Sequence, residues 1–252
     1  YYVSLDFSPN LQMRAGQFKV PFTRQYYQSA AKHAFTDYAL PIKSINDGRD
    51  IGVEVFSENV SNGLVEYHLG AFNGNGSNKK ANDNTDVEVA GRMVFKWNRF
   101  NPHNEGFWGT APGFAVGASG YTNHLSNATS EEKTGTDVDV TAGIRGLFVA
   151  GEYGQVRTLS AGEERTSAGY YGQAGYMIVP GTVEILARYA AYDPNSEEED
   201  DSKTELRLAI TLFHSGHNHK VTVEGAKITE ETGPGDANES TAACIQYQFC
   251  FQ

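Results

Sequence analysis

The sequence predicts an all-β protein, a transmembrane antiparallel β-barrel in which about 13 strands can be counted. Apolar and polar residues alternate with a period of two, the pattern of strands whose two faces meet different surroundings. Glycine (27) and aromatic residues (14 Tyr, 14 Phe) are frequent, as expected for many strands joined by turns. The connections between the segments fall into a short and a long class, which is typical of outer-membrane barrels.

Charge and hydropathy exclude several other classes of protein. The chain has 20 Lys+Arg against 31 Asp+Glu, a net charge of −11. This argues against nucleic-acid binding, which needs a basic face to meet phosphates. No run approaches the ~18–20 apolar residues of a transmembrane helix. Cys244 and Cys250 fall in one expected strand, roughly 20 Å apart at ~3.3 Å per residue, so we expect no disulfide between them.

Thirteen segments show the strand pattern, and many approach the ~9–11 residues that a tilted strand needs to cross a bilayer. The clearest is 205–213, where Leu208 and Ile210 share one face and Arg207 and Thr211 the other. A soluble sandwich alternates as well, so the strand faces alone do not decide between the two folds. The segments are 1–7, 11–19, 51–56, 64–72, 87–97, 114–121, 138–145, 147–156, 170–179, 183–189, 205–213, 220–227 and 243–251.

The connections favour the barrel over the sandwich. Short turns are expected at 8–10, 57–63, near Gly146, and at 180–182 and 214–219. Long polar loops are expected at 20–50, 73–86, 122–137, 157–169, 193–204 and 228–242. The connection 98–113 is the exception, a long member of the short class. An open sheet edge is not viable in lipid, so an odd strand count implies missing N-terminal strands or a miscounted one.

Several motifs occur in an order that resembles a known family. They are LQMRAGQFKVPF at 11–22, GRDIGV at 48–53, GAFNG at 70–74, GY before VPG at 175–181, ARY at 187–189, and the aromatic-rich last strand. Over nearly its whole length the chain resembles the phosphate-selective (O and P type) porins of Gram-negative outer membranes. The resemblance implies a 16-stranded, usually homotrimeric pore in contact with outer-membrane lipids and lipopolysaccharide. It places the GQFK strand fifth, so three strands would precede the 13 visible ones, and residues 1–252 would form a single barrel domain.

The same resemblance makes residues 20–50 a constriction loop that folds into the lumen. A structureless loop of about 30 residues is uncommon and suggests a function. Basic groups in a narrow, poorly solvated passage can bind anions through charge-assisted hydrogen bonds. An ordinary surface loop is the alternative. The expected constriction residues are Arg24, Lys32, His33, Lys43 and Asp37.

The polar strand faces are expected to line the lumen with charges of both signs. Phosphate-selective members of the family carry a ladder of arginines and lysines, whereas carboxylates are interspersed here. Neighbours of opposite sign on adjacent strands would cancel, which predicts weak ion selectivity. The expected lumen residues are Arg14, Glu54, Glu66, Arg92, Lys96, Arg145, Glu152, Arg188 and Arg207.

No catalytic or metal site is expected, and no cofactor. His214, His217 and His219 cluster in a turn without a carboxylate or cysteine, and no Gly-x-Ser-x-Gly elbow occurs. The sequence therefore predicts a porin, a passive diffusion channel for small ions and solutes, with anions such as phosphate as candidates. One alternative is a scaffold barrel that sheaths a partner protein such as an electron-transfer cytochrome. Another is a soluble sandwich or adhesion domain.

Overall fold

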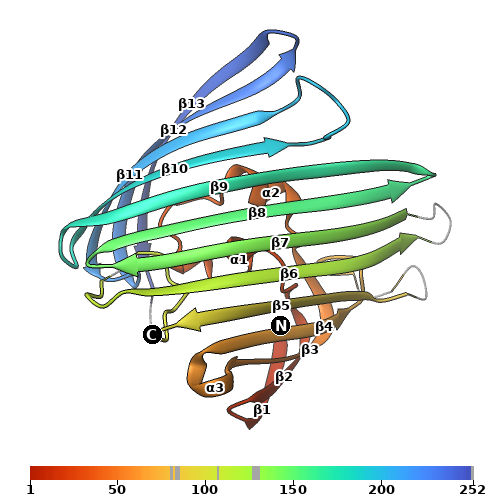
Figure 1. The fold of residues 1–252 in the computed structure, drawn as a ribbon, viewed down its shortest axis with the longest axis horizontal. Helices are drawn as coiled ribbons and strands as arrows, with labels where there is room; N and C mark the ends of the chain where they lie inside the picture. Colours follow the sequence, from red (N-terminus) through yellow and green to blue (C-terminus); the bar gives the residue numbers. More distant parts are fainter. Residues whose placement is uncertain (80–81, 83–85, 107, 127–130, 251–252) are drawn as a thin grey trace.

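The structure, a computed structural model, describes residues 1–79, 82, 86–106, 108–126 and 131–250 and forms one antiparallel sheet (Figure 1). Its 13 strands lie in sequence order, each paired with the next. The predicted fold class and strand count are thus confirmed. The strands are β1 (Tyr2–Ser8), β2 (Leu11–Lys19), β3 (Arg49–Asn59), β4 (Val65–Phe72), β5 (Glu88–Trp97), β6 (Gly113–Ser126), β7 (Glu131–Ile144), β8 (Leu147–Ser160), β9 (Glu163–Val179), β10 (Val183–Asp193), β11 (Lys203–Ser215), β12 (His219–Gly233) and β13 (Asp236–Phe249).

The sheet is strongly curved and wraps around helical turns of the chain between β2 and β3 (Figure 1). These turns are α1 (Arg24–Tyr27), η1 (Ala30–Lys32) and α2 (Leu40–Ile45). A further turn, α3 (Val60–Gly63), joins β3 to β4. Strands β1 and β13 are the two edges, and no pairing joins them among the described residues. The curl is that of a barrel wall, with a gap between the first and last strands.

Three connections expected as long loops are instead extensions of the strands. Strands β8 and β9 stay in register out to Ser160↔Glu163, with only Ala161 and Gly162 between them. Strands β12 and β13 remain paired out to Gly233↔Asp236. Strand β6 likewise continues past Thr122, although residues 127–130 of that predicted loop lie outside the described part. The hairpin ends carry mixed polar residues without a repeating apolar face, so the period-two signal disappears there.

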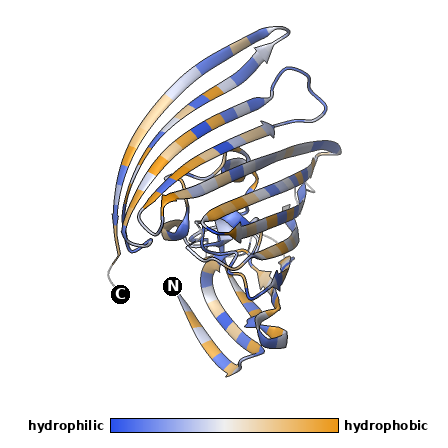
Figure 2. Ribbon diagram, turned by 60° about the vertical axis from the view of Figure 1, so that its left-hand side comes forward, coloured by the Kyte–Doolittle hydropathy of each residue, from blue (hydrophilic) through white to orange (hydrophobic). Residues whose placement is uncertain are grey.

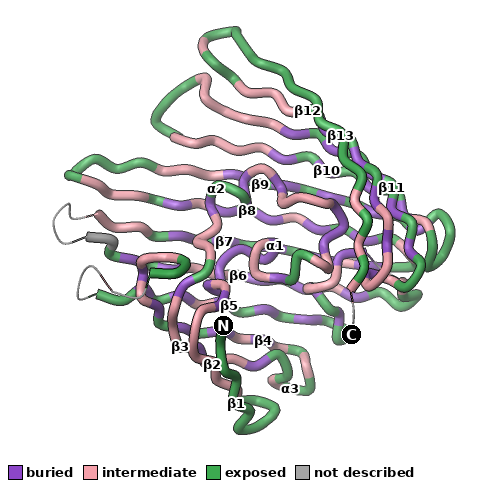
Figure 3. Tube along the Cα trace, turned by 180° about the vertical axis from the view of Figure 1, so that it is seen from behind, coloured by how far each residue is buried: buried purple, intermediate pink, exposed green. Residues whose placement is uncertain are grey.

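Hydrophobic and hydrophilic residues alternate along the strands (Figure 2), so the two faces of the sheet have opposite chemistry. On β11, Leu208 and Ile210 are 58% and 52% exposed, whereas Glu205, Arg207 and Thr211, at the alternate positions of the strand, are buried. The same alternation of buried and exposed residues runs along β5 to β12 (Figure 3). The buried residues face the concave side, where Glu152 accepts the backbone N–H of Gln25. A soluble protein buries its apolar face and exposes its charges, so this reversed arrangement requires an apolar surrounding. Val89, Met93, Leu208 and Ile210 are exposed on this apolar face, and Ile245 and Tyr247 are exposed on the edge strand β13.

A hydrophobic core lies inside the curl, between the sheet and the chain that joins β2 to β3. Phe22 of this connection meets Tyr121 of β6 edge-to-face at 4.8 Å. Ile42 and Ile45 of α2 are buried with them in one cluster. Residues 20–48, called the inward loop below, therefore pack against the concave face. Among the described residues, no helix is long and apolar enough to cross a membrane.

Candidate functional site

The inward loop is fixed to the concave wall by its own polar side chains as well as by its apolar ones. Gln25 is fully buried, and its backbone N–H donates to Glu152 on β8 at 3.1 Å. Its side-chain oxygen accepts the backbone N–H of Ala39 at 2.7 Å, which ties α1 to the start of α2. Helix α2 contacts β8, β9 and β10. The loop thus occupies the side of the interior that these strands enclose.

Arg24 is an anchoring residue. It has 0% exposure, and its guanidinium donates to Glu105 at 2.7 Å and to the hydroxyl of Tyr171 at 2.5 Å. It also donates to the carbonyl of Pro102 at 3.2 Å. The expectation that Arg24 faces permeating anions is therefore wrong, because the side chain is fully buried and both of its terminal nitrogens already donate to buried partners.

The other expected loop residues divide between buried and open positions. His33 is buried, with its Nε2 at 2.9 Å from the carbonyl of Gln25, and burial lowers its pKa to about 4. It is neutral at pH 7, so the expectation of a cation there is corrected. Lys32 is half-buried. Lys43 is exposed and pairs with Asp37, so this cation is compensated where it meets water.

The expected lumen residues form compact ion-pair networks on the concave wall. Arg92 contacts Asp139 at 2.6 Å across the sheet. On β10 to β12 a chain of charges runs from Arg188 to Glu205 and Arg207, each contact 2.8 Å, and on to Glu224. These side chains are almost fully buried. Paired and desolvated charges present little net field to a passing ion.

A third network lies on β2 to β5, nearer the open edge of the sheet. Arg14 pairs with Glu54, and the other oxygen of this carboxylate lies 3.1 Å from Nδ1 of His68. Glu66 bonds to His68 at 3.1 Å and to Lys96 at 3.3 Å. Arg145 joins none of these networks. It lies in the turn between β7 and β8, exposed and with a φ of 48°, because β7 ends one residue earlier than expected.

A polar cavity of about 700 Å³ remains between the inward loop and strands β1 to β3. Lys19 and Arg49 flank the two ends of the inward loop and are direct register partners on β2 and β3. Neither forms an ion pair with a carboxylate in the described part of the chain. The charged and aromatic residues lining the cavity are Arg14, Lys19, Arg49, Glu58, His103, Tyr2, Phe18, Tyr26, Tyr27 and Tyr38.

Two like charges placed directly opposite each other on paired strands destabilise a sheet unless something compensates them. Lys19 satisfies two of its donors with the carbonyls of Tyr26 and Gln28, both at 2.6 Å, and these are neutral acceptors. The positive charge of Lys19 and Arg49 is therefore available to an ion in the cavity. An anion is the species that this arrangement suits.

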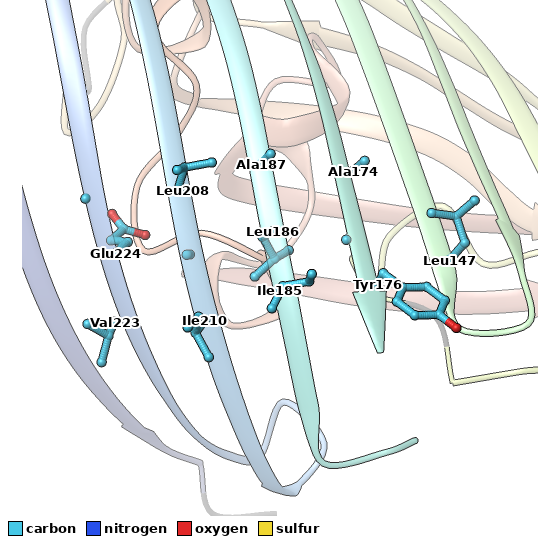
Figure 4. Close-up of a pocket in the computed structure, with 13 residues that line it drawn as sticks. Leu147, Ala174, Tyr176, Ile185, Leu186, Ala187, Leu208, Ile210, Val223 and Glu224 are labelled. Carbon is cyan, nitrogen blue, oxygen red and sulfur yellow. The ribbon is translucent and has the colours of Figure 1, made fainter. Parts of the chain in front are cut away.

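A second hollow of about 700 Å³ lies on the convex side, across β8 to β12 (Figure 4). Its floor has small residues such as Ala174, Ala187 and Gly225, and its rim carries Tyr176 and Leu208. Most of these side chains belong to the exposed apolar face, so the hollow opens toward the surroundings of the sheet and is separate from the polar interior.

Sequence reasoning missed Lys19, Arg49 and Glu105. Lys19 lies within the GQFK motif, and Arg49 starts the strand after the loop, so their pairing depended on a register that the sequence left open. Glu105 lies in the connection 98–112, whose unusual length was the only signal in the sequence. Its partner Arg24 is 81 residues away.

Comparison with known proteins agrees with this geometry. The family model described as phosphate-selective porin O and P matches residues 1–223. No curated protein matches the sequence significantly. Among solved structures, the anion-selective porin from Comamonas acidovorans is similar with a TM-score of 0.65 and 13% identity, over 97% of this chain and 76% of that porin. OpdK from Pseudomonas aeruginosa, solved with vanillate, has a TM-score of 0.47 and 11% identity, over 97% and 77%.

Proposed function

The chain belongs to the phosphate-selective porin O and P family, and we propose that it passes small anions, phosphate among them, through the cavity beside β1 to β3. Membership of this family makes it a porin, a membrane-embedded passive diffusion channel for small ions and solutes. Family and fold indicate a channel rather than an enzyme. The outer membrane of a Gram-negative bacterium is the proposed location, with its lipids and lipopolysaccharide around the apolar belt.

The observation that carries the anion proposal is the uncompensated pair Lys19 and Arg49 at the cavity. The carboxylates expected to favour cations, Glu54, Glu66 and Glu152, are buried and have polar or basic partners. The sequence alone predicted that opposed lumen charges cancel and leave weak selectivity. With these carboxylates withdrawn, Glu58 is the one carboxylate among the described residues that line the cavity, against Arg14, Lys19 and Arg49, and the balance shifts toward anions.

The inward loop is the proposed constriction. It fills the interior beside β8 to β10 and leaves the cavity as the space next to β1 to β3. Lys32 and the Lys43–Asp37 pair lie on its less buried side, where they would tune the local field. Of the residues expected to act at the constriction, these three keep that proposed role.

We propose that further strands close the wall between β1 and β13. Each of these strands has an edge that pairs with no other strand among the described residues. Unpaired backbone groups in hydrocarbon cost several kcal/mol each, so a membrane-embedded wall needs to be closed. A 16-stranded barrel and a homotrimer are the corresponding proposals for the complete assembly.

A scaffold barrel around a partner protein is the alternative function, and the comparisons give it no support. Such a sheath needs a wide interior. Here the inward loop buries Phe22, Ile42 and Ile45 inside the curl. The remaining cavity of about 700 Å³ is far smaller than a folded domain.

Phosphate block of the chloride current tests the anion proposal. The purified channel in planar bilayers should show a chloride conductance that falls when phosphate is added, because both anions compete for Lys19 and Arg49. The double variant Lys19→Gln/Arg49→Gln should lose most of this block. Arg157→Gln, which removes an exposed cation on β8 outside the cavity, is the matched control and should keep it. Equal block in all three proteins would contradict the assignment.

A further inference from the structure

The described residues of the connection between β5 and β6, 98–106 and 108–112, enter the interior from the end of the sheet that carries the short turns. We call these residues the strap. His103 of the strap contacts Glu66 on the concave wall at 2.8 Å, and Trp108 packs edge-to-face on Phe213 at 5.2 Å. The inward loop enters from the opposite end of the strands. The two segments meet inside the curl, far from each other in the sequence.

Glu105 makes three of the hydrogen bonds between them, beside the one from Arg24 to the carbonyl of Pro102. One of its carboxylate oxygens accepts from Arg24 at 2.7 Å, and the other accepts the backbone N–H of Ala34 at 2.8 Å. Its own backbone N–H donates to the carbonyl of Lys32 at 3.0 Å. These three hydrogen bonds hold both ends of residues 24–34 of the inward loop.

The contact is also held from the wall. His217, in the turn between β11 and β12, lies with its Nε2 at 2.5 Å from the carbonyl of Glu105. Lys220 donates to the carbonyl of His33 at 2.6 Å. Both Arg24 and Glu105 are fully buried, so water does not compete for their bonds. The guanidinium of Arg24 holds the pKa of Glu105 well below its usual range, so this carboxyl group stays ionised in the pair.

We infer that Glu105 is a positioning residue that locks the inward loop to the strap and so sets the position of the pore constriction from the opposite end of the barrel. This inference rests on the proposed function for the role of the loop, and the lock itself is independent of it. A carboxylate is required because two donors converge on its two oxygens. A glutamine offers one oxygen, and its amide N–H₂ would face either Arg24 or the N–H of Ala34.

The lock is tested by measuring solvent access to position 34, because Ala34 bonds to Glu105 and is only 2% exposed. Ala34→Cys is introduced after Cys244→Ser and Cys250→Ser, and the rate of thiol labelling is measured in folded protein. Glu105→Gln should raise this rate by about 100-fold or more, because removing one partner of a buried ion pair shifts the docking equilibrium by at least that factor. Glu163→Gln, on an exposed carboxylate of β9, is the matched control and should leave the rate unchanged.

Glu105→Asp provides a second variant if the glutamine protein does not fold. It keeps the charge but is one methylene shorter, so it cannot span both donors, and the labelling rate should rise by less. Heat-dependent mobility on gels verifies folding of every variant. Labelling that stays at the parental rate in both folded variants overturns the lock.

Single-channel recording on the same proteins separates the lock from the proposed function. A released loop should produce conductance sublevels above the parental level, with the fraction of time spent there rising in parallel with the labelling rate. Faster labelling with an unchanged current would leave the lock intact and overturn the assignment of this loop as the constriction. A parental protein that does not conduct would overturn the proposed function, while the labelling result still decides the lock.

Discussion

An arginine placed on the convex face of β11 should destabilise the protein according to its depth in the membrane. Leu206, Leu208, Ile210 and Leu212 share this face and are 51%, 58%, 52% and 51% exposed, so packing inside the protein is nearly the same at each. Leu208 pairs with Ala187 and Gly225 on the neighbouring strands. These small neighbours leave space for a guanidinium, so its cost reports the surroundings and not a steric clash.

The expected magnitude follows from strand geometry. Two residues advance about 6.7 Å along a strand, or roughly 5 Å in depth at a tilt of about 40°. Positions 206 to 212 therefore sample about 15 Å of an apolar band roughly 25 Å tall. Leu208→Arg or Ile210→Arg, at the middle of the series, should lower the free energy of unfolding by about 2–4 kcal/mol. The outer positions should cost less, approaching about 0–1 kcal/mol near the interfaces.

The assay is reversible unfolding by guanidinium chloride of protein folded into lipid vesicles, followed by tryptophan fluorescence. Leu208→Ala measures the loss of apolar contact alone and is the control. A peak of destabilisation in the middle of the series supports the lipid-facing assignment. A flat series, or an arginine at position 208 that costs no more than alanine, would refute it.

Three further predictions follow from the same architecture. Replacing residues 22–47 of the inward loop with a short Gly-Ser linker should raise single-channel conductance, because the narrowest section controls the resistance; unchanged conductance would place the constriction elsewhere. The polypeptide taken from the membrane should have an intact mass above 27.5 kDa if additional strands close the wall, and a mass equal to that value would contradict the closure proposal. The free energy of unfolding should fall by about 3 kcal/mol as pH drops from 6.5 to 4, because the pKa of His33 is lowered from 6.5 to about 4 in the folded protein and the unfolded chain binds the proton first. His33→Gln should flatten this pH dependence of stability, and a variant with the parental pH dependence would refute the assignment of His33 as a buried neutral side chain.

The strands were predictable wherever the two faces of the sheet meet different surroundings. The alternation of Leu208 and Ile210 with Arg207 and Thr211 arises because one set lies on the exposed convex face and the other faces the interior. Beyond the apolar band the two faces meet the same surroundings, so the alternation of apolar and polar residues disappears from the sequence. The paired extension Ser160↔Glu163 was therefore expected to be a loop.

The site was predictable only in part, because its chemistry depends on contacts between distant segments. That Arg14, Glu54 and Arg188 lie on the interior face follows from the period of two. Which of the charged side chains remain unpaired and accessible to an ion does not follow from this period. Arg24 looks like a free loop cation in the sequence and becomes a buried anchor through Glu105, whereas Lys19 and Arg49 are brought opposite each other only by the register of β2 and β3.

The zero-current potential in a potassium chloride gradient tests the central claim most directly. The claim is a water-filled channel whose passage beside β1 to β3 carries the uncompensated cations Lys19 and Arg49. The purified channel should conduct and show a potential of the sign for anion preference, larger at low salt because the Debye length grows from about 10 Å at 0.1 M to about 30 Å at 0.01 M. Lys19→Gln/Arg49→Gln should bring this potential close to zero or reverse it, while Arg157→Gln should not change it. A cation-preferring potential in the parental channel, or one that the double variant leaves unchanged, would contradict the account.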